Sequence, residues 1–540
     1  MRVVRNGLCR SGFALILAIV GAGCGAEDTV TVGAAPPAPT VAHSSVTVAS
    51  VAAPANPITM AATPSALNRA YAQIYRLDGV ADADIEKVLV LMPGFLGGAG
   101  NFDYIARRIV ERSGGKTAVW AVDRRSNGLE DQTGFDAAEA AKDPDVAKGY
   151  YFGGKAIDGK TFAGLLDAPS LSFVSEWGIQ VHVEDLDALI QEAGRRSPRA
   201  AIFLGGHSLG ASIVPIYAAW DFGGRAGFER LSGIVLLEGG PNPGASTPSQ
   251  QEYETEGIGG TSVESIRNGP PTSGFPFARP DIFLTLEVVA MRASNLTAAA
   301  TSLSPDADLY ASFFGPLFGL PPPPMTNEAA LGFGMDNDFQ PFAFSRVSMG
   351  LARGPLEPNP TAELIAPGQG LLRPADSETT YEWGAKAASG DLEPTDLRTF
   401  ARTLFAGPSN YAEWYFPARL SLDVRVTANV NVPPTGDWRK DVYGLAVTEN
   451  HRVDVPVFAV GGSKGLLNDL TRLDPYRESI APTLRNGQSR AGVAAGFQTR
   501  LQQGYAHLDV LSARDDGEGN GEFAALTQWM DEAVHLAPPP

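Results

Sequence analysis

Cysteine is almost absent from this chain of 540 residues, which has only Cys9 and Cys24. Cleavage of an export signal would remove Cys9 and leave Cys24 for the attachment of a lipid. The folded part of the chain then has no thiol for an internal disulfide, a cysteine metal site or a cysteine nucleophile. We therefore expect its stability to come from the packing of a hydrophobic core.

Positive charge is also scarce, because 60 aspartates and glutamates outnumber 42 lysines and arginines and give a formal net charge of −18. A surface of this charge repels the phosphates of nucleic acids, so the composition argues against a nucleic-acid partner. Hydrophobic residues make up 44% of the chain, which is enough for a substantial buried core at this length.

Long apolar runs are missing near the N-terminus, where the segment 13–20 is too short to cross a bilayer as a permanent helix. The basic residues before it complete the pattern of a signal peptide over residues 1–24. Gly21-Ala22-Gly23-Cys24 resembles the bacterial lipobox, although Gly21 replaces the usual leucine. We expect an exported lipoprotein, anchored to a membrane through Cys24 in the periplasm or on the cell surface. Secretion without the lipid is the alternative.

Strand patterns alternate with helical patterns over residues 65–240 and return over residues 451–540. The continuous apolar runs 88–92 and 118–122 are typical of strands buried on both faces, and the segment 102–110 between them has helical spacing. This alternation predicts an α/β fold with a mostly parallel central sheet, whose ligands bind at the carboxyl ends of the strands.

Two segments do not follow this alternation. Residues 25–64 are rich in alanine and proline and carry few charges, which predicts a disordered tether between the anchor and the body. Residues 241–450 are too many for an ordinary connection, so we expect a cap or lid insertion between the two parts of the core. Some of its many aromatic residues should line an apolar pocket, and most should pack the cap.

The segment Gly206-His207-Ser208-Leu209-Gly210 follows an apolar strand pattern and precedes a helical one. A serine between two glycines in this context is typical of a nucleophile elbow, a sharp turn that exposes the hydroxyl group and leaves backbone N–H groups free. The glycines leave space where side chains would collide with the neighbouring strand or helix. The pattern predicts Ser208 as a nucleophile.

A serine nucleophile needs a histidine as its base, and His507 is the histidine that directly follows the last predicted strand. The other histidines lie in the tether, on a helix, on the elbow, before a strand and in the C-terminal tail: His43, His182, His207, His451 and His535. Glu238 follows the strand 234–237 and is the predicted carboxylate that orients the imidazole. Asp469 and Asp474, after a later strand, are the alternatives.

Two backbone N–H groups should stabilise the oxyanion that forms during attack by the serine. Leu209 supplies one of them, and the glycine-rich loop after the first core strand supplies the other, from Phe95 or, as the next choice, Leu96. The loop lacks the spacing of a phosphate-binding motif. The charged residues of the segment 123–131 are expected either to form ion pairs that hold a loop in place or to contact a polar part of the substrate.

The chain resembles the bacterial serine esterases and lipases of the α/β-hydrolase fold. The resemblance rests on Pro93-Gly94-Phe95, on the segment 206–210 and on the segment 505–509, in this order, and covers about residues 85–240 and 451–536. Pro93 stands where many members have histidine, and Glu238 follows an earlier strand than is usual. The cap and the tether are not covered.

The resemblance implies an α/β-hydrolase fold with a large cap insertion and a hydrolase that cleaves carboxylic esters through an acyl-enzyme on Ser208. Its partner is a small-molecule or lipid-like ester, and it needs no metal and no organic cofactor. Acyl transfer to another alcohol by the same triad is one alternative. A surface binding protein that kept the fold but lost the chemistry is the other.

Overall fold

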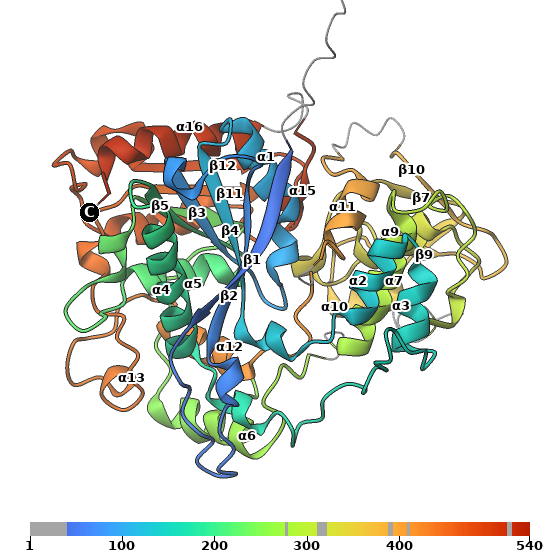
Figure 1. Ribbon diagram of the computed structural model, residues 1–540, viewed down its shortest axis with the longest axis horizontal. Coiled ribbons are helices and arrows are strands. Elements are labelled where there is room, and N and C mark those ends of the chain that lie inside the picture. The colour runs from blue at the N-terminus through green and yellow to red at the C-terminus, as the bar shows by residue number, and fades with distance from the viewer. Residues whose placement is uncertain are drawn as a thin grey trace, which may run out of the picture. The chain divides into compact units, whose positions relative to one another are not determined.

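A sheet of eight strands lies at the centre of the described part of the chain (Figure 1). The structure is a computed structural model that describes residues 40–275, 279–309, 311, 321–386, 393–407, 411–515 and 521–539. Six of the sheet's strands, β4, β3, β5, β6, β11 and β12, are parallel to one another, whereas β2 is antiparallel to both of its neighbours, β1 and β4. In spatial order they are β1 (Val41–Ala49), β2 (Arg69–Leu77), β4 (Thr117–Asp123), β3 (Lys87–Met92), β5 (Ala201–His207), β6 (Gly233–Leu237), β11 (Val457–Gly462) and β12 (Phe497–Gln502). The predicted mostly parallel sheet is confirmed.

Helices cover both faces of this sheet, which explains why β3 has no polar face. Val88 and Val90 pack in one hydrophobic cluster, while Leu89 and Leu91 pack in another on the opposite face, because side chains alternate along a strand. All six residues of β3 are buried. The first cluster includes α4 (Ile179–Arg196) and α5 (Leu209–Ala218), and the second includes α1 (Asp103–Arg112) and α16 (Gly521–Leu536).

The tether expected over residues 25–64 is wrong from residue 41 onward. Residues 41–49 form β1, which pairs with β2 along its whole length, from Val41 opposite Leu77 to Ala49 opposite Arg69. The low charge of this segment is therefore that of a strand in the sheet, in which Val46 is buried. Residues 25–39 lie outside the described residues, and so do the predicted signal peptide over residues 1–24 and Cys24.

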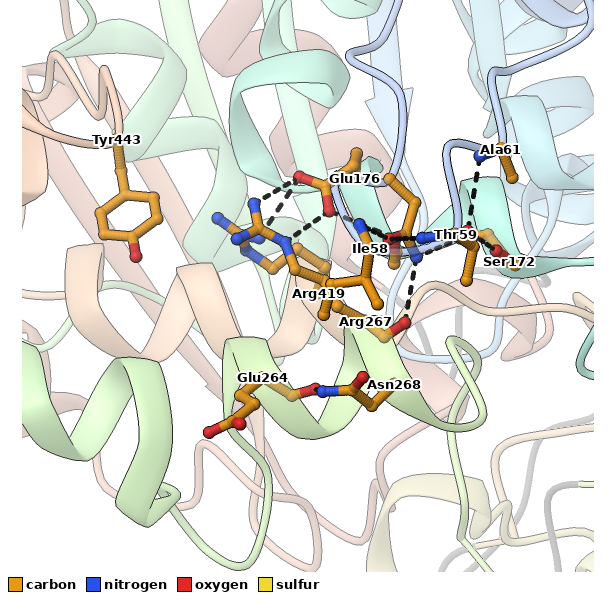
Figure 2. Close-up of polar contacts among 12 residues, drawn as sticks. Ile58, Thr59, Ala61, Ser172, Glu176, Glu264, Arg267, Asn268, Arg419 and Tyr443 are labelled. Atoms are coloured by element: carbon orange, nitrogen blue, oxygen red, sulfur yellow. Dashed lines mark hydrogen bonds and ion pairs between the residues drawn. The ribbon is translucent and has the colours of Figure 1, made fainter.

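The segment after β1 is fixed by polar contacts rather than free. Asn56 is buried, and its side-chain amide donates to the carbonyl oxygens of Ser172 and Arg267, at 3.1 Å each. The hydroxyl of Thr59 bonds to that of Ser172, and the Arg267 guanidinium pairs with Glu176 through two bonds of 2.7 and 2.8 Å (Figure 2). These contacts hold residues 50–64 against the body of the protein.

The described residues of the segment 241–450 form several helices and four short strands, β7 (Leu351–Arg353), β8 (Leu356–Pro358), β9 (Leu372–Pro374) and β10 (Glu382–Gly384). A second segment, between β4 and α4, lies beside them, because α3 packs against α7 and α2 packs against α3 (Figure 1). Arg292 on α7 forms an ion pair of 2.7 Å with Asp145 on α3. The cap is therefore built from two segments of the chain. Its helices are α2 (Thr133–Ala141), α3 (Pro144–Tyr151), α7 (Pro280–Ala293), α9 (Asn327–Met335), α10 (Pro360–Ile365) and α11 (Leu397–Thr403).

The described helices of the segment 241–450 do not all belong to the cap, because one of them packs against helices of the core. The helix α12 (Ala418–Thr427) contacts α4, α5 and α6 (Val263–Asn268), and α13 (Trp438–Asp441) follows it. Within the described ranges, no helix combines the length and the apolar character needed to cross a membrane.

Candidate active site

The turn that carries Ser208 joins β5 to α5 at the carboxyl edge of the sheet. Ser208 has φ +56° and ψ −119°, a conformation that side-chain-bearing residues rarely adopt, and its N–H donates to Leu237 O at 2.8 Å. A Cβ atom on Gly206 would overlap the carbonyl group of Gly210, and one on Gly210 would overlap Met92 O. The strand, the strained serine and the helix occur as the sequence predicts.

His507 and Glu238 are brought together although they are far apart in the chain. The distance from His507 Nδ1 to Glu238 Oε2 is 2.9 Å, and both side chains are buried. Glu238 directly follows β6 and also accepts N–H bonds from Gly462, from Leu466 at 2.7 Å and from Leu467 at 3.4 Å. Because these donors fix the carboxylate, it can fix the plane and the tautomer of the imidazole in turn.

The other ring nitrogen of His507 is available for chemistry. Its Nε2 atom is buried and has no hydrogen-bond partner among the described residues, and His507 lines the same cavity as Ser208. His207, on the elbow, donates from Nε2 to the carbonyl oxygen of His507 at 3.0 Å. Burial, helped by the charge of His507, holds the pKa of His207 well below its usual range, so His207 is neutral at pH 7.

The two alternative acids lie elsewhere. Asp469 is exposed and accepts two bonds from Thr471 at the start of a short helix. Asp474 forms an ion pair of 3.0 Å with Arg477. The structure therefore brings Glu238, and neither aspartate, into contact with His507.

The expected oxyanion donors border the same region. Leu209 is the first residue of α5, where a helix leaves its N–H groups without partners in the helix. Phe95 belongs to the loop after β3 and lines the cavity together with Leu96. A Cβ atom on Gly94 would lie 2.8 Å from the Cβ atom of Ser208, so this loop runs directly against the elbow.

The cavity at Ser208 has a volume of about 90 Å³ and a mainly apolar lining. The cap contributes side chains such as Phe283, Leu286, Met335 and Phe344 to it.

Phe95 also lines a larger groove of about 590 Å³, together with Leu209, Phe275, Leu422 and Arg425. Phe95 packs against Phe275, Phe344 and Phe416, with ring centroids 6.5, 5.8 and 4.8 Å away. Aromatic residues of the cap segment thus do line the pocket.

The position of this site in the sheet decides the fold family. A serine on a strained turn after β5 of an open, mostly parallel sheet, with the histidine after the last strand, is the arrangement of the α/β-hydrolases. The chain has the α/β-hydrolase fold. No protein-family model matches its sequence, and no curated protein does.

Several solved structures are similar to this α/β-hydrolase fold. A protein from Sulfolobus solfataricus has 12% identity and a TM-score of 0.43, with 91% of this chain and 95% of that chain covered. A peroxisomal α/β-hydrolase from Saccharomyces cerevisiae has 10% identity and a TM-score of 0.37, with 92% and 91% covered. A monoacylglycerol lipase from Paleococcus ferrophilus has 11% identity and a TM-score of 0.31, with 83% and 97% covered. None of these similarities assigns an activity to this chain.

The charged run 123–131 forms ion pairs, as one of its two interpretations predicts. Arg124 pairs with Glu413 at 2.6 Å, and Arg125 bonds to Asp185 with its Nε at 2.8 Å. Both arginines are buried, which sequence reasoning does not foresee for a charged run. In the ranges that the structure describes, no group of three or more His, Cys, Asp or Glu side chains could hold a metal ion.

One buried carboxyl group near the site has no partner. Glu287 on α7 follows Leu286, which lines the cavity, and neither of its carboxyl oxygens has a hydrogen-bond partner among the described residues. Burial, together with the charge of Glu130, raises the pKa of Glu287 well above its usual range. The carboxyl group of Glu287 is therefore neutral in the folded state. Below the pKa that Glu287 has in the unfolded chain, the stability of the folded state is complete. As the pH rises from there toward the folded pKa, the unfolded chain loses this proton first, and the free energy of unfolding falls.

Replacement of Glu287 by glutamine, which cannot ionise, should remove this loss. We expect Glu287→Gln to raise the Tm by about 2–4 °C or more at pH 8 and to change it much less at pH 5, as measured by thermal unfolding. Glu264 on α6 is exposed, so Glu264→Gln is the matched control and should have little effect at either pH. An equal shift at both pH values for Glu287→Gln would contradict the assignment.

Proposed function

We propose that this protein is a serine hydrolase that cleaves carboxylic esters, like an esterase or a lipase. One observation carries the proposal: Glu238 accepts a bond from Nδ1 of His507, while Nε2 of the same ring has no partner among the described residues. His507 also lines the cavity at Ser208. A positioned acid, base and hydroxyl group at one cavity are the parts that acyl transfer to a serine requires.

In the proposed reaction the hydroxyl oxygen of Ser208 attacks the ester carbonyl carbon while His507 Nε2 takes the hydroxyl proton. The N–H groups of Leu209 and Phe95 stabilise the oxyanion, and Glu238 stabilises the imidazolium. The intermediate collapses, the alcohol leaves with the proton from His507, and an acyl-enzyme on Ser208 remains. Water then attacks the acyl carbon while His507 Nε2 takes a proton from it. The bond from this carbon to Ser208 Oγ breaks, the carboxylic acid leaves, and Oγ regains its proton from His507.

The two cavities support a small-molecule or lipid-like ester as the substrate. The compartment at Ser208 is small and apolar, whereas the groove beyond Phe95 and Leu209 is larger and has polar residues such as Ser421 and Arg425 at its wall. We propose that the smaller part of the ester occupies the first and the larger part the second. The export of the protein and its lipid anchor at Cys24 stay predictions from the sequence.

Covalent labelling tests the function directly. A fluorophosphonate probe is expected to add one adduct to the folded protein, and peptide mass mapping should place it on Ser208. The variant Ser208→Ala should take up no label and should hydrolyse no ester above background, while it keeps the Tm of the wild type. Labelling that persists in the alanine variant, or a wild type that neither reacts with the probe nor hydrolyses esters, would overturn the proposal.

A further inference from the structure

Arg124 stands out because its guanidinium group, at the end of β4, binds backbone carbonyl groups of the loop that carries Phe95. It donates from Nη1 to Pro93 O at 2.9 Å, and from Nη2 to Gly94 O and to Gly97 O at 2.7 Å each. The side chain is almost fully buried. One planar group thus fixes three of the five carbonyl groups of residues 93–97, which we name the oxyanion loop.

Glu413, from the segment before α12, fixes Arg124 in turn. Its Oε2 atom accepts a bond from Arg124 Nε at 2.7 Å, and its other oxygen accepts one from Ser126. The same segment also lies alongside the oxyanion loop, because the N–H of Glu413 donates to Leu96 O and the N–H of Gly98 donates to Tyr411 O, both at 2.8 Å. The loop is therefore held on one side by Arg124 and along its length by residues 411–413.

The bond to Gly94 O decides the direction of the next N–H group. In a trans peptide the C=O of Gly94 and the N–H of Phe95 point in opposite directions. Gly94 O faces Arg124, at 2.7 Å, and the N–H of Gly97, at 3.2 Å, so the N–H of Phe95 points away from both. The loop meets the elbow at Gly94, where an added Cβ atom would lie 2.8 Å from Ser208 Cβ.

We propose that Arg124, held by Glu413, is a positioning residue that aims the N–H group of Phe95 at the oxyanion formed on Ser208. This inference rests on the proposed function and adds a residue that contacts neither substrate nor nucleophile. A guanidinium group is suited to the role because its fork reaches separate acceptors at fixed angles, whereas a lysine ammonium group is a single point of charge. The negative charge of Glu413 compensates the buried positive charge.

The kinetics of Arg124 variants test the inference. We expect Arg124→Lys and Arg124→Met to lower kcat for ester hydrolysis by about 10²–10³-fold, the loss found when one oxyanion donor is removed, and to change KM by less than about threefold. The double variant Arg124→Met/Glu413→Gln removes both buried charges and should show the same loss if the single variants do not fold. Rates are compared per molecule of folded protein, determined by circular dichroism.

The neighbouring residue provides a matched control. Arg125 is equally buried but bonds to Asp185 and not to the oxyanion loop, so Arg125→Met should lower the Tm and leave kcat per folded molecule within about threefold of wild type. The inference is overturned if folded Arg124 variants keep the wild-type kcat, or if Arg125→Met loses as much kcat. If the wild type hydrolyses no ester, the proposed function fails instead, so the two failures are distinguishable.

Discussion

Replacement of His507 by alanine is expected to lower kcat for ester hydrolysis by about 10⁴–10⁶-fold, the largest effect of any single change apart from loss of Ser208 itself. Without the imidazole no group takes the serine proton, and none returns a proton to the departing alcohol. KM should change by less than about threefold, because His507 is only one of many residues that line the cavity. Steady-state rates on an activated and an ordinary ester measure both constants.

A second histidine controls for this change. His451 is exposed and has no place in the proposed reaction, so His451→Ala should keep the wild-type kcat. The loss in His507→Ala should be smaller for an ester with a good leaving group, such as a nitrophenyl ester, because that alcohol departs without a proton. Wild-type activity in folded His507→Ala would remove this residue from the mechanism.

Local patterns in the sequence were sufficient for most of the fold and for the strained turn that carries Ser208. A strand buried on both faces is apolar through most of its length, so the runs 88–92 in β3 and 118–122 in β4 are recognisable without any knowledge of their neighbours. The elbow is equally local, since Gly206 and Gly210 are required by contacts within a few residues and with the adjacent strand. The contact between His507 and Glu238 was predictable because the carboxyl ends of parallel strands meet at one edge of the sheet.

Features that depend on distant partners were not predictable from the sequence. Among the described residues, the strand β1 pairs with β2 alone, and its composition resembles that of the alanine- and proline-rich residues around it. Arg124 and Glu413 are separated by 289 positions, and nothing near either residue indicates the other. The packing of α3 with α7 likewise depends on contacts such as that between Arg292 and Asp145, 147 positions apart. Such contacts become visible only in the folded chain.

Replacement of Glu238 by glutamine is expected to lower kcat by about 10³–10⁴-fold with KM little changed. Both carboxyl oxygens of Glu238 accept bonds, one from the N–H of Gly462 and the other from Leu466 N–H and His507 Nδ1. An amide has only one acceptor oxygen, so its NH₂ group must face either a backbone donor or the imidazole. The imidazole then loses the orientation and the tautomer that leave Nε2 free to accept a proton. Steady-state kinetics at fixed pH measure the effect.

The backbone at Glu238 makes glutamine the informative replacement. Glu238 has φ +53°, a strained conformation that glutamine shares and glycine would relieve, so the glutamine variant isolates the chemistry of the carboxylate. Asp469→Asn and Asp474→Asn remove the two other acids considered for this role and should leave kcat within about threefold of wild type. If Asp469→Asn or Asp474→Asn abolishes the activity while Glu238→Gln keeps it, the imidazole is oriented by another acid in the working enzyme, and the contact between Glu238 and His507 serves stability alone.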